Sequence, residues 1–224
     1  MVSHIWKNYN VCCTDQGRFI SRNGFFTLRD DEETRAMYPF RFAFTVRYSL
    51  DGSSLRQEYV VQNDGDEALP FSLGVHTALS CPLNPEERFE AYEIRFPFPI
   101  TIDRRVKKDN LMTTQTRPLL RNVDALPLDY ALFDEAAVAL VGMPVMALKL
   151  KNKEGSYHAR YRFDDYADLG IWTMRGAPFI CIEPWNGYDS CVDGVDDILQ
   201  KPGILLLQPG ITRSFFSTID FSVQ

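Results

Sequence analysis

The sequence predicts an all-β protein, and two observations support this class. Apolar and polar residues alternate over several short runs, most clearly over residues 40–50, where Phe42, Phe44 and Val46 lie between polar or small neighbours. No segment has the length and the 3.6-residue period of a convincing helix. Because Gly, Pro and Asp turns separate the runs at short spacing, we expect a sandwich or a barrel.

Length and composition are consistent with a single domain. The chain has 224 residues, of which 45% are hydrophobic and 24% charged, as is ordinary for globular proteins. No internal repeat or linker divides it, so we expect one domain over residues 1–224, with residues 1–26 the hardest to interpret.

Charge and cysteine usage exclude several classes of function. The formal net charge of −6 argues against binding to nucleic acid or to an anionic membrane surface. No apolar stretch approaches the ~20 residues of a membrane-spanning helix, and no secretory signal is present. The five cysteines are odd in number and contain no CxxC pair, which argues against a disulfide framework and a zinc site. We therefore expect a metal-free protein of the reducing cytoplasm.

The first half of the chain predicts a three-stranded antiparallel meander. Its strands are expected over residues 40–50, 55–62 and 71–76, with turns at Asp51-Gly52 and at residues 63–66. The charged segment before it, residues 27–35, is expected to be an exposed loop.

The second half predicts further strands and one long irregular segment. A strand over residues 91–96 should end at Pro97 and Pro99, and residues 103–122 should form a long excursion that could include a short hairpin. A helical turn and a strand are expected within residues 128–140. Further strands are expected over residues 145–151, 157–163, 169–174 and 210–223.

The stretch from Gly176 to Gly187 holds the first candidate functional residue. Residues 179–182 form a short apolar run that is typical of a strand buried on both faces, and Glu183 follows directly. Pro184 cannot donate to a sheet, so the strand is expected to end there. A buried carboxylate is costly without partners, so Glu183 is either kept for chemistry or a structural acceptor of backbone N–H groups.

His76 is the second candidate. It shares a face with Ser72 and Gly74, whose small side chains leave open space beside an imidazole. Taken alone, a single histidine in a strand is more often a surface residue or a satisfied core residue than a catalytic one.

Two segments together resemble a known family. The segment PFSLGVHTALSCPL at residues 70–83 resembles the histidine motif of the aldose 1-epimerases, and GAPFICIEPWNG at residues 176–187 is similar to the glutamate motif of their bacterial LacX-like branch. The resemblance runs from about Leu28 to the C-terminus. Thr77 and Leu79 depart from the motif, which usually has Pro and Phe there.

The resemblance implies a galactose mutarotase-like β-supersandwich and a cofactor-free reaction that interconverts the α and β anomers of an aldohexose. His76 would be the general acid and Glu183 the general base. Trp185 would be a platform for a face of the sugar, although a core role is equally open. Asp134 is a candidate for a third, sugar-binding residue.

The resemblance also implies a chain shortened at its N-terminus, because several strands precede the corresponding region in this branch. His4 is a candidate for a sugar-binding histidine of the family, without the accompanying Gly and Arg. Two alternatives to an active enzyme follow: a non-catalytic carbohydrate-binding module on the same fold, or a remnant that needs a partner to supply the lost strands.

Overall fold

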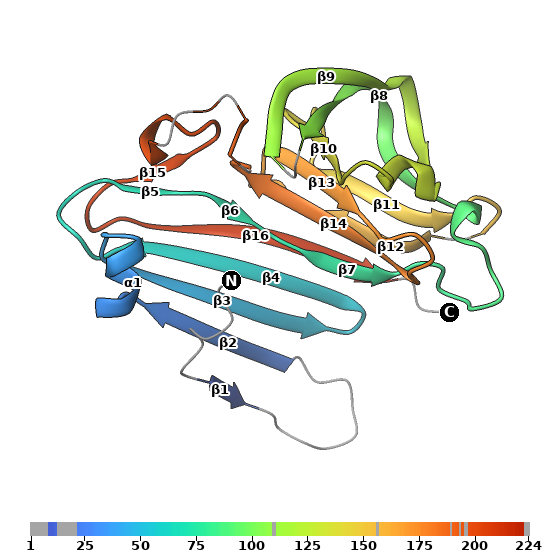
Figure 1. Ribbon diagram of the computed structural model, residues 1–224. Helices are drawn as coiled ribbons and strands as arrows, with labels where there is room; N and C mark the ends of the chain where they lie inside the picture. The colour runs from blue at the N-terminus through green and yellow to red at the C-terminus, as the bar shows by residue number, and fades with distance from the viewer. Residues whose placement is uncertain are drawn as a thin grey trace. The chain divides into compact units, whose positions relative to one another are not determined.

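The computed structural model describes residues 9–12, 22–108, 111–155, 157–188, 190–192, 194 and 197–221 (Figure 1). These residues form two compact units, one made of Met1–Phe71 with Leu205–Val223 and the other of Ser72–Ile204. The expected single domain over residues 1–224 stays a prediction. Within the described ranges, no helix is long and apolar enough to span a membrane.

The first unit is an antiparallel sheet with one short helix. Its strands pair in the order β1-β2-β3-β4-β16, and β5 pairs separately with β15. The bounds are β1 Tyr9–Cys12, β2 Arg22–Arg29, α1 Glu32–Met37, β3 Phe42–Asp51, β4 Ser54–Asn63, β5 Leu69–Phe71, β15 Leu205–Leu207 and β16 Thr212–Phe221.

The predicted β3–β4 hairpin is confirmed, but the meander is wrong. β3 ends at Asp51, β4 begins at Ser54, and Gly52 takes the positive φ of 54° that the turn requires. The other edge of β4 is occupied by the C-terminal strand β16 rather than by the third run. Residues 71–76 instead contain the end of β5, which pairs with β15, and all of β6, which pairs with β14. The next strand, β7, also pairs with β14. The alternation of residues 71–76 carries no information about which strand they pair with.

The charged segment before β3 is ordered, which corrects the predicted loop. Residues 27–29 complete β2, and α1 follows because Asp31 and Thr34 form a capping box. The Asp31 carboxylate accepts from the Thr34 N–H at 2.9 Å, and the Thr34 hydroxyl accepts from the Asp31 N–H at 2.8 Å.

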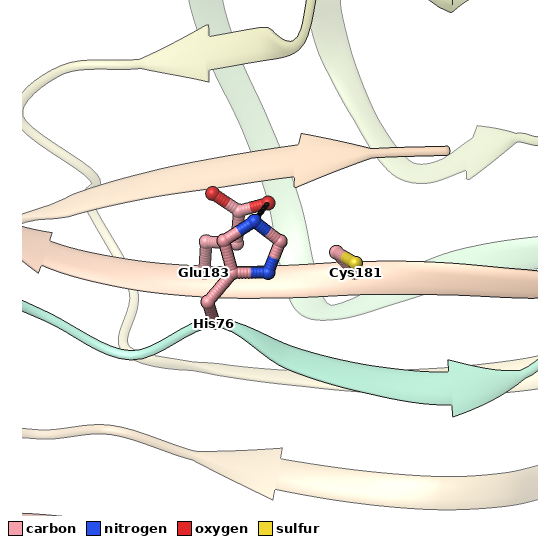
Figure 2. Close-up of side chains that lie close together, drawn as sticks. All are labelled: His76, Cys181 and Glu183. Carbon is pink, nitrogen blue, oxygen red and sulfur yellow. Dashed lines mark ion pairs between the residues drawn. The ribbon is translucent and has the colours of Figure 1, made fainter. Parts of the chain in front are cut away.

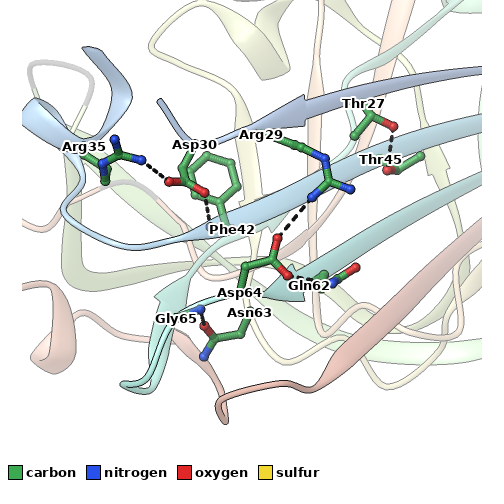
Figure 3. Close-up of polar contacts among 10 residues, drawn as sticks. All are labelled: Thr27, Arg29, Asp30, Arg35, Phe42, Thr45, Gln62, Asn63, Asp64 and Gly65. Carbon is green, nitrogen blue, oxygen red and sulfur yellow. Dashed lines mark hydrogen bonds and ion pairs between the residues drawn. The ribbon is translucent and has the colours of Figure 1, made fainter. Parts of the chain in front are cut away.

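Side-chain bonds join the strand ends of this unit (Figure 3). Asp30 accepts from the Phe42 N–H and pairs with Arg35, and Arg29 pairs with Asp64 at 3.2 Å. Buried Asn63 accepts from the Gly65 N–H and donates to the Leu207 carbonyl, so the end of β4 is tied to β15. A buried amide that satisfies several backbone groups fixes one conformation of the turn.

The second unit carries the candidate site. Its strands pair in the order β12-β11-β8-β10-β13-β14, with β6 and β7 on the outer edge of β14 and β9 on β8. The bounds are β6 Leu73–Gly74, β7 Thr77–Ser80, η1 Phe89–Ala91, β8 Tyr92–Lys108, β9 Leu111–Pro127, η2 Tyr130–Phe133, β10 Val138–Leu140, β11 Ala147–Asn152, β12 Tyr157–Arg162, β13 Asp168–Trp172, β14 Phe179–Asn186 and η3 Ile198–Gln200.

Residues 103–122 were predicted as an irregular excursion that could include a short hairpin, and they belong to a long hairpin of regular strands, β8–β9. Pro97 and Pro99 do not end β8, because they lie where the pairing register with β9 shifts between Arg95 and Ile100. Irregular stretches of a ladder tolerate the missing proline N–H. The helical turn and strand expected within residues 128–140 are confirmed as η2 and β10.

The core of this unit lies around β13 and β14. Leu169, Ile171, Ile180 and Ile182 are completely buried on one face of the two strands, and Cys181 is 2% exposed on the other face of β14, as expected for a strand covered on both faces. Asp168 is buried at the start of β13, where its carboxylate accepts from the Gly142 N–H at 2.9 Å. Burial raises the pKa of this carboxyl group above its ordinary value of 3.8, and the Gly142 bond and the charge of Arg105 only partly offset this.

Asp168→Asn should change the pH dependence of stability. The pKa of Asp168 is higher in the folded protein than in the unfolded chain, where it is about 3.9. Between these two pKa values the folded protein binds more protons than the unfolded chain, so the wild type loses stability as the pH rises through this range. Asparagine keeps an acceptor for Gly142 and does not titrate. Melting temperatures should therefore favour the variant more at pH 7 than at pH 4. A difference that stays constant between these two values would contradict the assignment.

Candidate functional site

β14 runs straight through Pro184, which corrects the predicted strand end. The Pro184 carbonyl accepts from the Val75 N–H at 3.0 Å. The amide and carbonyl of a strand residue point to the same side, so both would be directed at Val75. Because proline has no N–H, the ladder lacks only the bond from Pro184 to the Val75 carbonyl. That missing bond coincides with the gap between β6 and β7, and β14 keeps its pairing with β13.

The register across this gap brings the two candidate residues together. Gly74 faces Trp185 and Thr77 faces Ile182, so the same register places His76 opposite Glu183. Since Val75 and Pro184 form a hydrogen-bonded position, the next pair is a non-hydrogen-bonded one. The Cα atoms of such pairs approach to about 4.5 Å, and their side chains lie closest.

His76 and Glu183 point toward each other (Figure 2). The His76 Nε2 lies 3.3 Å from the Glu183 Oε1, and the two form an ion pair when the imidazole is protonated. The histidine side chain is 64% exposed and the glutamate only 8%. The His76 and Trp172 rings also make a T-shaped contact, with centroids 6.3 Å apart and planes at 78°. A buried carboxylate is therefore paired with an accessible proton donor.

Two glycines determine where the Trp185 indole lies. A Cβ atom at Gly170 would be 2.2 Å from Trp185 Cζ2, and one at Gly74 would be 2.7 Å from its Cδ1. Gly74 belongs to β6 and Gly170 to β13, the two neighbours of β14. The indole therefore lies across the neighbouring strands in space that any side chain there would fill.

These side chains line a cavity of about 620 Å³ within the second unit. Its wall includes His76, Glu183 and the aromatic residues Trp172, Trp185 and Tyr188. Such a volume is within the usual range of small-molecule sites, and flat aromatic faces beside polar groups are suited to a ring with an apolar face and a polar edge.

Two lysines add positive charge to the same wall. Lys107 comes from the end of β8 and Lys201 follows η3, and both are half-buried. Ammonium groups donate hydrogen bonds but accept none. The cavity therefore offers donors from both lysines and an acceptor from Glu183.

Cys181 lies next to the paired residues. It precedes Glu183 by two positions on β14, so strand alternation places both on one face. Burial, and secondarily the charge of Glu183, raises the pKa of the Cys181 thiol to about 11. Cys81, Cys181 and Cys191 are all free thiols.

Asp134, another predicted site residue, does not lie at this cavity. Asp134 is half exposed and accepts from the Arg175 guanidinium at 2.6 and 2.7 Å, and it does not line the cavity. His4 lies outside the described residues. Sugar binding by either residue stays a prediction. Sequence reasoning missed the roles of Trp172, Lys107 and Lys201, although the cross-strand pairing of Trp172 with Cys181 follows once the register is known.

Comparison with known proteins identifies the family. The aldose 1-epimerase family profile matches residues 20–194. The chain belongs to the aldose 1-epimerase family. It is 30% identical over 189 residues to the plasmid and chromosomal LacX proteins of Lactococcus lactis subsp. lactis, an alignment that covers 82% of this chain and 63% of theirs.

Solved structures show the same fold. A galactose mutarotase related enzyme from Lactobacillus acidophilus matches with a TM-score of 0.83 and 24% identity, covering 97% of this chain and 72% of its own. A galactose mutarotase-like protein from Lactobacillus casei matches with a TM-score of 0.81 and 24% identity, covering 96% and 73%. The predicted all-β, galactose mutarotase-like fold is thus confirmed.

Gly170→Ala should destabilise the second unit and displace the Trp185 indole. The added methyl group overlaps the ring, and overpacking of this kind costs about 1–3 kcal/mol. Gly24→Ala is the matched control, because a Cβ atom there meets nothing within 4 Å. Denaturant unfolding measures both variants. Equal midpoints for the two would show that Gly170 is not needed to accommodate the indole.

Proposed function

We propose that this protein interconverts the α and β anomers of an aldohexose, with His76 and Glu183 as the proton-transfer groups. The observation that carries the proposal is the opposed pair, 3.3 Å apart on the wall of the cavity, in a chain that belongs to the aldose 1-epimerase family. The chain spans 63% of the length of the LacX relatives. The activity is therefore proposed from the residues of this chain and is not taken over from those longer proteins.

The reaction needs one proton acceptor and one proton donor. Glu183 takes the proton from the anomeric hydroxyl, while protonated His76 donates to the ring oxygen. The bond between C1 and the ring oxygen breaks, and an open-chain aldehyde forms. Rotation about C1–C2 exposes the other face of the carbonyl, and the reverse proton transfers close the ring as the other anomer. No atom is gained or lost, and no oxidant or reductant is required.

The placement of the two groups suits these transfers. The anomeric oxygen and the ring oxygen are bonded to the same carbon, so groups a few ångströms apart can reach both. Glu183 is held on a buried strand and His76 is accessible from the cavity. Trp185 and Trp172 offer apolar faces to the sugar ring, and Lys107 and Lys201 offer donors to its hydroxyl groups.

Glu183→Gln should lower kcat/KM for mutarotation by about 10²–10⁴-fold, because it removes the base and keeps the size of the side chain. Polarimetry of freshly dissolved α-glucose or α-galactose measures the rate. Glu93→Gln is a matched control: the side chains of Glu93 and Glu183 are both 8% exposed, but Glu93 pairs with Arg95 and does not line the cavity.

Two results would contradict the proposal. A folded wild-type protein that does not exceed the buffer rate would remove the catalytic function. Equal rates for the wild type and Glu183→Gln would remove the assigned base. If calorimetric titration then showed sugar binding, the alternative of a non-catalytic carbohydrate-binding module would be favoured.

A further inference from the structure

The candidate pair has a third neighbour that mutarotation does not use. The ligand atoms of His76, Cys181 and Glu183 all lie within 4.8 Å of one another (Figure 2). Cys181 and Glu183 come from one face of β14, and His76 comes from the connection between β6 and β7. Three side chains of the kinds that bind metals therefore converge from β14 and from the neighbouring β6–β7 connection.

The ligand atoms of His76 and Glu183 already have the spacing of two ligands bound to one tetrahedral metal ion. Two ligands about 2.0–2.1 Å from a tetrahedral ion lie about 3.3–3.4 Å apart. The His76 Nε2 and Glu183 Oε1 are separated by 3.3 Å. A sulfur at about 2.3 Å from the ion would lie about 3.6 Å from the nitrogen. Because the three ligand atoms lie within 4.8 Å of one another, the Cys181 Sγ needs to move by at most about 1.2 Å.

The donor types select the class of ion. Thiolate and imidazole favour Zn²⁺ and its thiophilic neighbours, whereas Mg²⁺ and Ca²⁺ prefer oxygen ligands. Three protein ligands leave the fourth position of a tetrahedral ion open, and here His76 and Glu183 face the cavity.

We propose that His76, Cys181 and Glu183 form a site for Zn²⁺, and that an ion bound there inhibits the protein by occupying its acid–base pair. The binding site is independent of the proposed function. Only the inhibition rests on it, because an ion that holds the imidazole and the carboxylate prevents both proton transfers.

Metal binding is tested first, without sugar. Co²⁺ is added to the purified chain as a spectroscopic substitute for Zn²⁺, and a thiolate-to-cobalt charge-transfer band is expected at one ion per chain. Zn²⁺ should abolish the band, and its displacement titration gives the zinc affinity. Cys181→Ser should lose the band and weaken zinc binding by a factor on the order of ten or more, since even second-shell ligand partners contribute that much.

Other thiols in the chain require a matched control. Cys191 and the adjacent Cys12 and Cys13 are further thiols of the sequence, so Cys12→Ser/Cys13→Ser/Cys191→Ser serves as the background. The band should persist in that background and disappear when Cys181→Ser or Cys181→Ala is added. Circular dichroism confirms that each variant is folded. A band that is absent from the wild type, lost in the background, or retained without Cys181 would overturn the site.

Inhibition is tested second, by polarimetry with and without Zn²⁺. Zinc should slow mutarotation by the wild type, EDTA should restore the rate, and Cys181→Ser should need at least about tenfold more zinc for the same inhibition. Inhibition that is equal in Cys181→Ser and the wild type would overturn the proposed mode of inhibition. Absence of any mutarotase activity would end the proposed function, whereas the cobalt titration would still decide whether the metal site exists.

Discussion

The candidate site depends on the register between β14 and the two short strands on its outer edge. Because Gly74 pairs with Trp185 and Thr77 with Ile182, His76 can only stand opposite Glu183. A slip of one residue would turn His76 to the other face of the sheet and separate it from the carboxylate. Pro184 removes one bond from this ladder, yet the Val75 N–H still reaches the Pro184 carbonyl and holds the register.

Strand alternation then determines which side chains of β14 lie at the site. Cys181, Glu183 and Trp185 share one face of β14, so the thiol, the carboxylate and the indole follow one another along that face of the strand. The neighbouring strands contribute glycines where the indole lies, and Trp172 packs beside His76. The same arrangement that suits proton transfer to a sugar also brings together the ligands of a candidate zinc site, whose occupation would oppose that transfer.

The local alternation of apolar and polar residues predicted where the strands lie better than it predicted which strands pair with each other. The alternation over residues 157–163 and the apolar run before Glu183 predict β12 and β14, because burial of one or both faces leaves a visible period. The strand ends predicted at prolines were wrong, because Pro97, Pro99 and Pro184 occupy positions where the ladder has a register shift or a gap and the strand continues. The sequence also placed residues 71–76 beside the preceding hairpin, and no local signal revealed their pairing with β14 and β15. The absence of CxxC argued against zinc, but cross-strand neighbours are not neighbours in sequence.

The most direct test of the central claim is a double-mutant cycle between His76→Ala and Glu183→Gln, with mutarotation rates measured by polarimetry. Residues that serve one reaction as a pair are strongly non-additive, so the double variant should lose little more activity than the more damaging single variant. If the two losses multiplied instead, His76 and Glu183 would be acting independently, and the opposed pair would not be the catalytic unit of this protein.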